Sequence, residues 1–269
     1  MQYAYGYQLN GSQAGGLDPS AKAYINAIVA AGATVTSVQK TAINNFIKAE
    51  KAASRWTLHK RIYLPIWGIA SPNAIDMVGL TSGTFVNSPT MGSGFIKGNA
   101  TTQYFNINTT LDSLGITSSN GSYIMGLKAE SSTTNRGNSG ALNAGGYFID
   151  FRFDTASGRR LAWLTTDTNT LGSFDTSQRS GVIVATRTST LQYTVHNHTS
   201  DLGTVVYPGG VPTVNPFIMA RNNNGSADIF SNSEIAFFGF GLGLSATDAK
   251  AYALAMKNLW QNCTGLTLP

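Results

Sequence analysis

Acidic residues are scarce in this sequence. Charged residues make up 12% of the 269 positions, about half of the usual share of roughly 25%. The only glutamates are Glu50, Glu130 and Glu234. The formal net charge of +5 therefore arises from few acids rather than from many bases. A basic balance of this origin is a weak indicator of nucleic-acid binding, and we do not expect a nucleic-acid partner.

Further absences exclude whole classes of protein. Cys263 is the single cysteine, so no internal disulfide can form. No run approaches the ~20 apolar residues that span a bilayer, so we expect no membrane insertion. The opening "MQYAYGYQLNGSQAGG" lacks the basic and apolar regions of a secretion signal, which predicts synthesis in a reducing cytoplasm. No G-x-S-x-G occurs, and no lysine follows "GNSGALNAGG", so neither a nucleophile elbow nor a phosphate loop is predicted.

Residues 1–17 are rich in Tyr, Gly and Gln. Tyr3, Tyr5 and Tyr7 alternate, which places three rings on one side of an extended segment. Two interpretations stay open, a loose terminus or an arm that docks on a neighbouring subunit. The second predicts self-association, as a homotrimer or a larger ring.

Residues 18–70 are predicted to be a helical segment that acts as a docking collar. Capping residues, each before a helical period, predict the starts of three helices: Asp18 for the first, Thr36 or Ser37 for the second, and Ser54 for the third. The third helix is expected to run through Leu64, where Pro65 ends it.

The same segment is the most basic part of the chain. Its basic side chains include Lys48, Lys51, Arg55, His59, Lys60 and Arg61. They are interpreted as a solvated helix face or as a contact surface for an acidic partner or a polynucleotide.

Residues 71–269 change in character. Short apolar segments alternate with Gly, Ser, Asn and Thr turns, which predicts about a dozen strands without intervening helices. This pattern is typical of an antiparallel β-sandwich. The run "EIAFFGFGLG" is apolar nearly throughout and is expected to be covered on both faces. Ser245 and Asp248 then form a capping box for a short C-terminal helix, expected to close one end of the sandwich.

The order of "ARNNNG", "SEIAFFGFG" and "LSATDAKAY" resembles the C-terminal strands of concanavalin A/laminin-G-like jelly-roll domains. More narrowly, it resembles such domains in tail or virion-surface proteins of bacteriophages. The segments "AYINA", "KTAINNFI" and "GFIKGNATTQYFN" contribute to the likeness, which covers most of residues 20–262. The resemblance implies a mainly β protein, with a jelly-roll sandwich preceded by a short helical segment.

The resemblance also implies a setting. We expect a structural component exposed on a phage virion, as a capsid decoration, tail fibre or baseplate protein, made in the host cytoplasm. Its partners would be copies of itself and other virion proteins, with host cell-surface glycan as a ligand. The alternatives are a carbohydrate-binding adhesin outside a virion and, third, a polysaccharide depolymerase.

One strand carries the candidate ligand site. In "YFIDFRFD", alternation places Asp150, Arg152 and Asp154 on the same face. Two carboxylates of a glycosidase lie ~5–9 Å apart, and these two are predicted about 6–7 Å apart. Arg152 between them is expected to lower both pKa values, which does not suit a general acid. We therefore predict a polar sugar-binding face or a solvated charge ladder, and no enzyme. Trp163, near a turn, is added as a candidate sugar contact.

His196 and His198, in "TVHNHTS", are weak candidates for metal ligands. In a strand they project to one side, but a site needs at least one further ligand. No metal or other cofactor is therefore predicted. Calcium stays an alternative because many lectin-like sandwiches use it, although the sequence has no acid-rich D-x-D-x-D loop.

Overall fold

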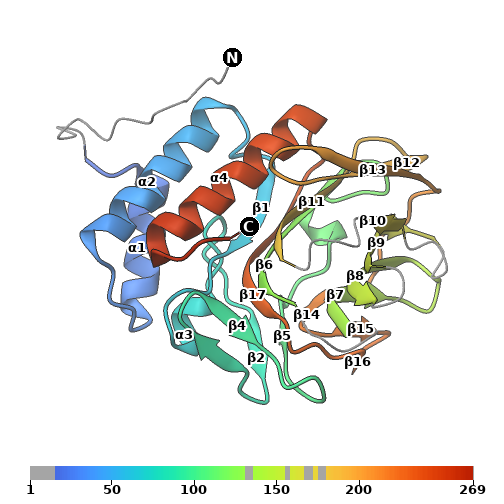
Figure 1. Cartoon of the computed structure of the whole chain (residues 1–269), viewed down its shortest axis with the longest axis horizontal. Helices are drawn as coiled ribbons and strands as arrows, with labels where there is room; N and C mark the ends of the chain where they lie inside the picture. The colour runs from blue at the N-terminus through green and yellow to red at the C-terminus, as the bar shows by residue number, and fades with distance from the viewer. Residues whose placement is uncertain (1–15, 131–135, 155–157, 167–171, 175–179, 269) are drawn as a thin grey trace.

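The computed structural model describes residues 16–130, 136–154, 158–166, 172–174 and 180–268. Tyr3, Tyr5 and Tyr7, and with them the predicted arm, lie outside the described residues. Two β-sheets face each other, and three long helices lie on the far side of one of them (Figure 1). This arrangement confirms the predicted mainly β sandwich.

The first sheet has eight strands in the described residues, in the order β13-β12-β11-β6-β17-β4-β3, with β1 also paired to β17. We call it the eight-stranded sheet. Its strands are β1 (His59–Tyr63), β3 (Thr90–Gly92), β4 (Phe95–Lys97), β6 (Gly121–Ala129), β11 (Gly181–Arg187), β12 (Gln192–His196), β13 (Asp201–Val206) and β17 (Glu234–Gly241).

The second sheet has nine strands in the described residues, in the order β10-β9-β8-β7-β14-β5-β2. In addition, β15 pairs with β7, and β16 pairs with β15. We call it the nine-stranded sheet. All its pairings are antiparallel except that of β15 with β7. Its strands are β2 (Thr84–Val86), β5 (Tyr104–Asn106), β7 (Arg136–Leu142), β8 (Phe148–Asp154), β9 (Gly158–Thr165), β10 (Gly172–Phe174), β14 (Phe217–Ile218), β15 (Arg221–Asn223) and β16 (Ser226–Asp228).

Two hydrophobic cores result. The core between the sheets is rich in aromatic rings: Tyr63, Phe105, Tyr123, Phe151, Trp163, Phe238 and Phe240. The second core lies between the eight-stranded sheet and the helices, and it contains Phe237 of β17. The strand β17 is therefore covered on both faces, as its continuous apolar sequence predicts.

The helical layer consists of α1 (Pro19–Ala30), α2 (Ser37–Ala52) and α4 (Ala246–Thr264). Two short helices, α3 (Ala70–Asn73) and η1 (Asp112–Leu114), complete the helices of the described residues. The predicted starts of the first two helices are confirmed. Asp18 accepts a hydrogen bond from the Ser20 amide, and Thr36 and Gln39 exchange the two bonds of a capping box.

The predicted third helix is wrong, because residues 59–63 form strand β1. This segment pairs with β17, so that Tyr63 lies opposite Phe238. Ile62 and Tyr63 enter different cores, one on each side of the sheet. Strand pairing satisfies the backbone while burying both side chains, and this tertiary gain overrides the weak local helix preference. The segment 18–70 thus contributes a strand to the sandwich.

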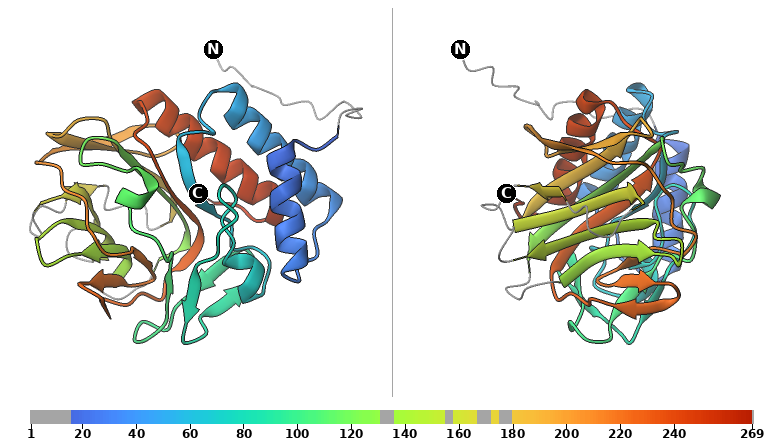
Figure 2. Two further views of the ribbon diagram at one scale, coloured as in Figure 1. Left: turned by 180° about the vertical axis from the view of Figure 1, so that it is seen from behind. Right: turned by 90° about the vertical axis from the view of Figure 1, so that its right-hand side faces the viewer.

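The C-terminal helix begins where predicted, since Ser245 accepts a hydrogen bond from the Asp248 amide at 3.1 Å. Its expected position is wrong. Instead of closing one end, α4 lies along the eight-stranded sheet beside α2 (Figures 1 and 2). Tyr252, Met256 and Trp260 are buried there. Among the helices of the described residues, none combines the length and apolar character needed to cross a bilayer.

Candidate functional site

The outer face of the nine-stranded sheet carries the predicted site around β8. Ile149 and Phe151 point into the core between the sheets, so Asp150 and Arg152 lie on the opposite face, as their alternation predicts. The expected exposure is wrong for Asp150, which is only 2% exposed, whereas Arg152 is partly exposed. The side chain of Asp154 lies outside the described residues.

A hairpin from another part of the chain brings Arg221 close to Asp150. Its strands β15 and β16 are joined at Asn224 and Gly225, which both have positive φ, as in the two-residue turns of tight hairpins. In register, Arg221 lies beside Gly140, and Gly140 lies beside Asp150. A Cβ at Gly140 would stand 2.9 Å from the Arg221 side chain. The missing side chain therefore lets Arg221 lie over the sheet next to Asp150.

Four charged side chains form the polar part of this site. Arg152 donates from Nη2 to Asp150 Oδ2. Arg221 holds Asp228 through two bonds, Nε to Oδ1 at 2.9 Å and Nη2 to Oδ2 at 2.6 Å. Asn223 donates to Asp228 Oδ2 at 3.0 Å. We call Asp150, Arg152, Arg221 and Asp228 the outer-face cluster.

The electrostatics of Asp150 differ from the sequence-based expectation. Burial raises the pKa of its carboxyl, and this effect outweighs the lowering by Arg152 and Arg221. Asp150 Oδ1 and Arg152 Nε are buried and have no hydrogen-bond partner among the described residues. Both atoms are enclosed by the protein and are therefore not themselves exposed to a ligand.

An aromatic group lies beside the cluster. Tyr104 stacks on Phe217, with ring centroids 4.4 Å apart, and Phe230 lies 6.3 Å from Tyr104. Phe217 lies opposite Gly140 in register, so the stack adjoins the position of Arg221. Tyr104 and Phe230 are partly exposed. Apolar rings next to paired charged groups are a surface that can bind the apolar and hydroxyl faces of a sugar.

The sequence analysis missed Arg221, Asp228 and Tyr104. A signal for two of them exists in "RNNNGSAD". An Asn-Gly two-residue turn places the residues three positions before and three positions after it in cross-strand pairs. That register puts Arg221 opposite Asp228. Their proximity to Asp150 has no signal in the sequence, because it depends on how distant strands associate.

The structure corrects the placement of Trp163. Its side chain is 1% exposed and lies in the core between the sheets. Its indole Nε1 donates to the Gly121 carbonyl at 3.1 Å, and its ring stacks with Tyr123. Trp163 is therefore not part of the outer-face cluster and cannot present its ring to a sugar.

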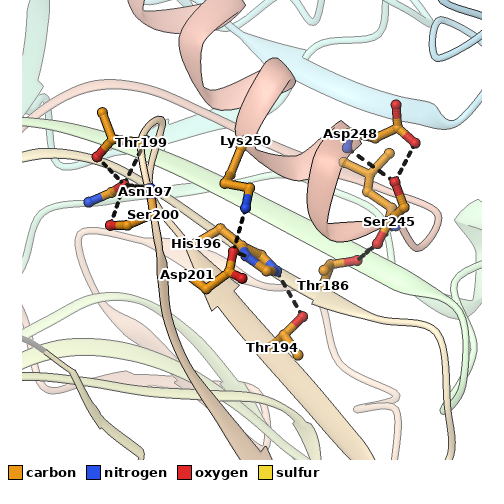
Figure 3. Close-up of polar contacts among 11 residues, drawn as sticks. Thr186, Thr194, His196, Asn197, Thr199, Ser200, Asp201, Ser245, Asp248 and Lys250 are labelled. Carbon is orange, nitrogen blue, oxygen red and sulfur yellow. Dashed lines mark hydrogen bonds and ion pairs between the residues drawn. The ribbon is translucent and has the colours of Figure 1, made fainter.

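The two candidate histidines are held by other side chains. His196 Nδ1 contacts Asp201 Oδ1 at 2.8 Å, and its Nε2 contacts Thr194 Oγ1 at 2.9 Å (Figure 3). Lys250 donates to the same Asp201 oxygen at 2.8 Å. His198 follows β12 and contacts Lys257 Nζ through Nε2 at 3.2 Å. Within the part of the chain that the structure describes, no three His, Cys, Asp or Glu side chains gather as a metal site.

The chain Thr194–His196–Asp201 has the order of a nucleophilic triad. However, His196 is only 2% exposed, because it lies on β12 where this strand packs against α4 (Figure 3). A substrate atom cannot reach the hydroxyl and the imidazole together in this position. We interpret these bonds as the attachment of the β12–β13 hairpin to α4.

Comparisons with known proteins give the fold class. The sequence matches no family model and no curated protein. One similar solved structure is a Trypanosoma rangeli sialidase in complex with the inhibitor DANA, with 10% identity and a TM-score of 0.50, over 72% of this chain and 32% of that one. The chain shares the β-sandwich fold.

Two other solved structures are also similar. Domain 4 of AbnA, a GH43 extracellular arabinanase from Geobacillus stearothermophilus, in complex with arabinotriose, has 11% identity and a TM-score of 0.49, over 72% of this chain and 98% of that one. The CBM40 of the Ruminococcus gnavus IT-sialidase has 13% identity and a TM-score of 0.40, over 51% of this chain and 84% of that one.

Proposed function

We propose that this protein binds carbohydrate through the outer face of its nine-stranded sheet and does not act as an enzyme. The observation that carries the proposal is the outer-face cluster. Arg152, Arg221 and Asp228 are partly exposed on the sheet and held in ion pairs, and an aromatic stack with a partly exposed ring lies beside them. Carboxylate and guanidinium groups bind pairs of sugar hydroxyls, and a ring covers the apolar side of the sugar.

The carboxylates of the outer-face cluster do not suit a glycosidase. A glycosidase needs one carboxyl as general acid and a second as free nucleophile or base. The raised pKa of Asp150 suits a general acid. Its partner would be Asp228, but both oxygens of Asp228 are bound by Arg221. A carboxylate held in this way is a poor nucleophile and a poor base.

A position on a phage particle rests on the sequence resemblance alone. The three solved structures named above are not phage proteins. We also propose that this protein lies on the surface of a phage particle, since such a surface protein can bind host glycans. Affinity purification of intact particles with antibodies against this chain tests it separately.

Binding at one site is expected to be weak. The nine-stranded sheet presents a shallow face, so a dissociation constant on the order of 1 mM is reasonable. Many copies acting together would then be needed for firm attachment, with avidity gains of about 10² to 10⁴.

The decisive variant is Arg221→Ala. It removes the bidentate partner of Asp228, and we expect binding on a glycan array to fall at least about tenfold. Asn223→Ala is a milder second variant, because Asn223 is exposed and its loss leaves the fold intact. Lys40→Ala, which removes an exposed positive charge from α2, is the control for net charge.

Unchanged glycan binding by Arg221→Ala and Asn223→Ala would refute this site. Release of reducing sugar from a bound glycan would refute the non-enzymatic part. Equal loss of binding in Lys40→Ala would mean that only net charge matters.

A further inference from the structure

The outer face of the nine-stranded sheet continues well beyond the outer-face cluster. Residues that lie opposite one another on neighbouring strands form a single row across five strands: Asp150, Gly140, Phe217, Asn106 and Thr84. Neighbouring strands lie ~4.8 Å apart, so this row is about 19 Å long. The right-hand view of Figure 2 looks onto this side of the molecule. A sugar ring is similar in size to one aromatic ring, so a single sugar would cover only part of the row.

The row stays on the outer face at each strand, because the chain neighbours of its members face the core. The buried neighbours are Ile149, Ala141, Ile218 and Phe105, and Phe85 packs against the same core. Successive side chains of a strand point to opposite faces. The members of the row therefore lie on one continuous surface.

A second polar group lies at the far end of the row. Asn108 donates from Nδ2 to Thr84 Oγ1 at 2.8 Å, and its amide donates to Asn106 Oδ1 at 2.8 Å. Thr84 is exposed and Asn106 is partly exposed. Among the described residues, neither the Thr84 hydroxyl proton nor the Asn106 Nδ2 has an acceptor, so both can donate to hydroxyl groups of a ligand. We call Thr84, Asn106 and Asn108 the far polar group.

The aromatic stack lies between the two polar groups. Phe217 stands in the row itself and is 5% exposed, and the partly exposed Tyr104 stacks on it. Neither ring belongs to a hydrophobic core. The order along the row is therefore charged cluster, aromatic ring and uncharged polar group. A ring covers the apolar side of one sugar, and polar groups on either side of it can bind hydroxyls of the next sugars in a chain.

The charges of the row cancel. Each arginine of the outer-face cluster is paired with an aspartate, and the far polar group is uncharged. Asp154 and Arg160, whose side chains lie outside the described residues, add one formal charge of each sign. An acidic sugar would need a cation that is not already paired, whereas a hydroxyl can donate to the carboxylate and accept from the guanidinium of an ion pair.

We propose that this row binds a chain of at least three linked neutral sugars rather than a single acidic sugar. The inference rests on the proposed carbohydrate binding and names the class of its ligand. Binding groups on successive strands fit a chain, because consecutive sugars can reach consecutive groups. Each sugar gains little by itself, so firm contact with the row requires several linked units.

The test uses the full chain and oligosaccharides of defined length. The neutral probes are gluco-, xylo-, arabino- and manno-oligosaccharides of one to six units. The acidic probes are oligogalacturonates of the same lengths and sialyllactose. In NMR titrations, we expect affinity for the best-bound neutral series to rise at least about tenfold from one unit to three and then to level off. Acidic probes should bind at least about tenfold more weakly.

Variants along the row locate the binding. Thr84→Ala should lower affinity for the neutral trisaccharide about three- to fivefold and affinity for the monosaccharide less than about twofold, because it removes one hydrogen bond at the far end. Tyr104→Ala should lower affinity for each length about tenfold, whereas Tyr104→Phe keeps the ring and should stay within about twofold of wild type. Thr90→Ala, at an exposed threonine on β3 of the other sheet, is the matched control and should change neither affinity. Thermal unfolding of each variant checks that it is folded.

The outcomes separate this inference from the proposed function. Equal affinity for one and three units would overturn the chain-binding row and leave carbohydrate binding intact. Tighter binding of sialyllactose or oligogalacturonate than of the neutral probes would overturn the neutral ligand class. Wild-type affinity of Thr84→Ala for the trisaccharide would exclude the far polar group from the site and overturn the proposed row. If no probe of either kind bound, the proposed function itself would be refuted, and this inference with it.

Discussion

The two sheets of this protein differ in how many of their faces are covered by other elements. The strand β17, "EIAFFGFG", is apolar on both faces because one face meets the second sheet and the other meets the helices. In strand β8, Ile149 and Phe151 point into the core between the sheets, whereas Asp150 and Arg152 lie on the opposite face. A strand covered on both faces can be apolar along its whole length, whereas a strand covered on one face alternates apolar and polar residues. The comparison explains why the charged outer-face cluster occurs on the nine-stranded sheet.

The difference is not one of exposure alone. Asp150 on β8 is nearly as buried as Phe237 on β17. Phe237 is packed against apolar side chains of the helices, whereas Asp150 has the charged side chains of Arg152 and Arg221 nearby. The first environment contributes hydrophobic stability, and the second is a polar cluster held by ion pairs.

The variant with the largest expected effect destabilises the eight-stranded sheet. Phe237→Ala removes a fully buried ring between β17 and the helices, where the ring fits against Gly126. We expect a loss of about 3–5 kcal/mol in the free energy of unfolding, from lost burial and the cavity left behind. Urea denaturation measures this loss. Asn223→Ala, on the outer face of the nine-stranded sheet, should change the same quantity by less than about 0.5 kcal/mol. Equal losses in the two variants would contradict the proposed difference between the sheets.

The next effect concerns the junction of the two sheets. Arg187 of β11 is fully buried, and its guanidinium donates to the carbonyl groups of Ser189, Thr190 and Tyr207 and, across the sandwich, of Trp163. Arg187→Met leaves buried carbonyl groups without donors, so we expect a loss of about 2–3 kcal/mol in the free energy of unfolding.

The matched variant at this position is Arg187→Lys. It keeps the charge but loses the planar fork that reaches several carbonyl groups, so it should recover only part of the stability. Full recovery with lysine would mean that charge matters here and hydrogen-bond geometry does not.

The smallest effect depends on pH and concerns the β12–β13 hairpin. Burial and the nearby Lys257 lower the pKa of His198 below its ordinary value of 6.5. On the same hairpin, Asp201 contacts His196 and accepts a hydrogen bond from Lys250 of α4. The folded protein therefore resists protonation of His198, and its stability should fall as the pH drops below 6.5 toward the lower folded pKa.

Because His198 is partly exposed, this loss should be below about 1 kcal/mol. His198→Gln keeps an acceptor for Lys257 but does not titrate. The difference in unfolding free energy between wild type and variant, measured from about pH 8 to pH 5, should therefore grow in favour of the variant as the pH falls. A difference that is constant across this range would contradict the interpretation.

Local patterns account for the correct part of the sequence-based prediction. Asp18 and Thr36 cap helices where they were expected to, and Ser245 does the same for α4. Caps and two-residue turns depend on neighbours within a few residues, so the sequence contains the information. The alternation in β8 also places Asp150 and Arg152 on one face correctly, because side-chain direction in a strand has a period of two.

Errors arose wherever distant segments decide the outcome. Residues 59–63 became β1 because β17, far along the chain, offered a pairing edge. Trp163 lies in the core because Tyr123 and Phe240 of the other sheet pack against it. Arg221 lies close to Asp150 because the missing side chain of Gly140 makes room for it. None of these contacts has a local pattern.

The sequence by itself determined the class of the fold, the capped helices, the impossibility of an internal disulfide and the concentration of net charge in residues 18–61. The tertiary structure alone decided which sheet the helices cover, and which charged side chains meet on the face left open. The physical reason is the range of the forces involved. Capping, alternation and formal charge are properties of adjacent residues, whereas burial and ion pairing depend on which distant surfaces come together.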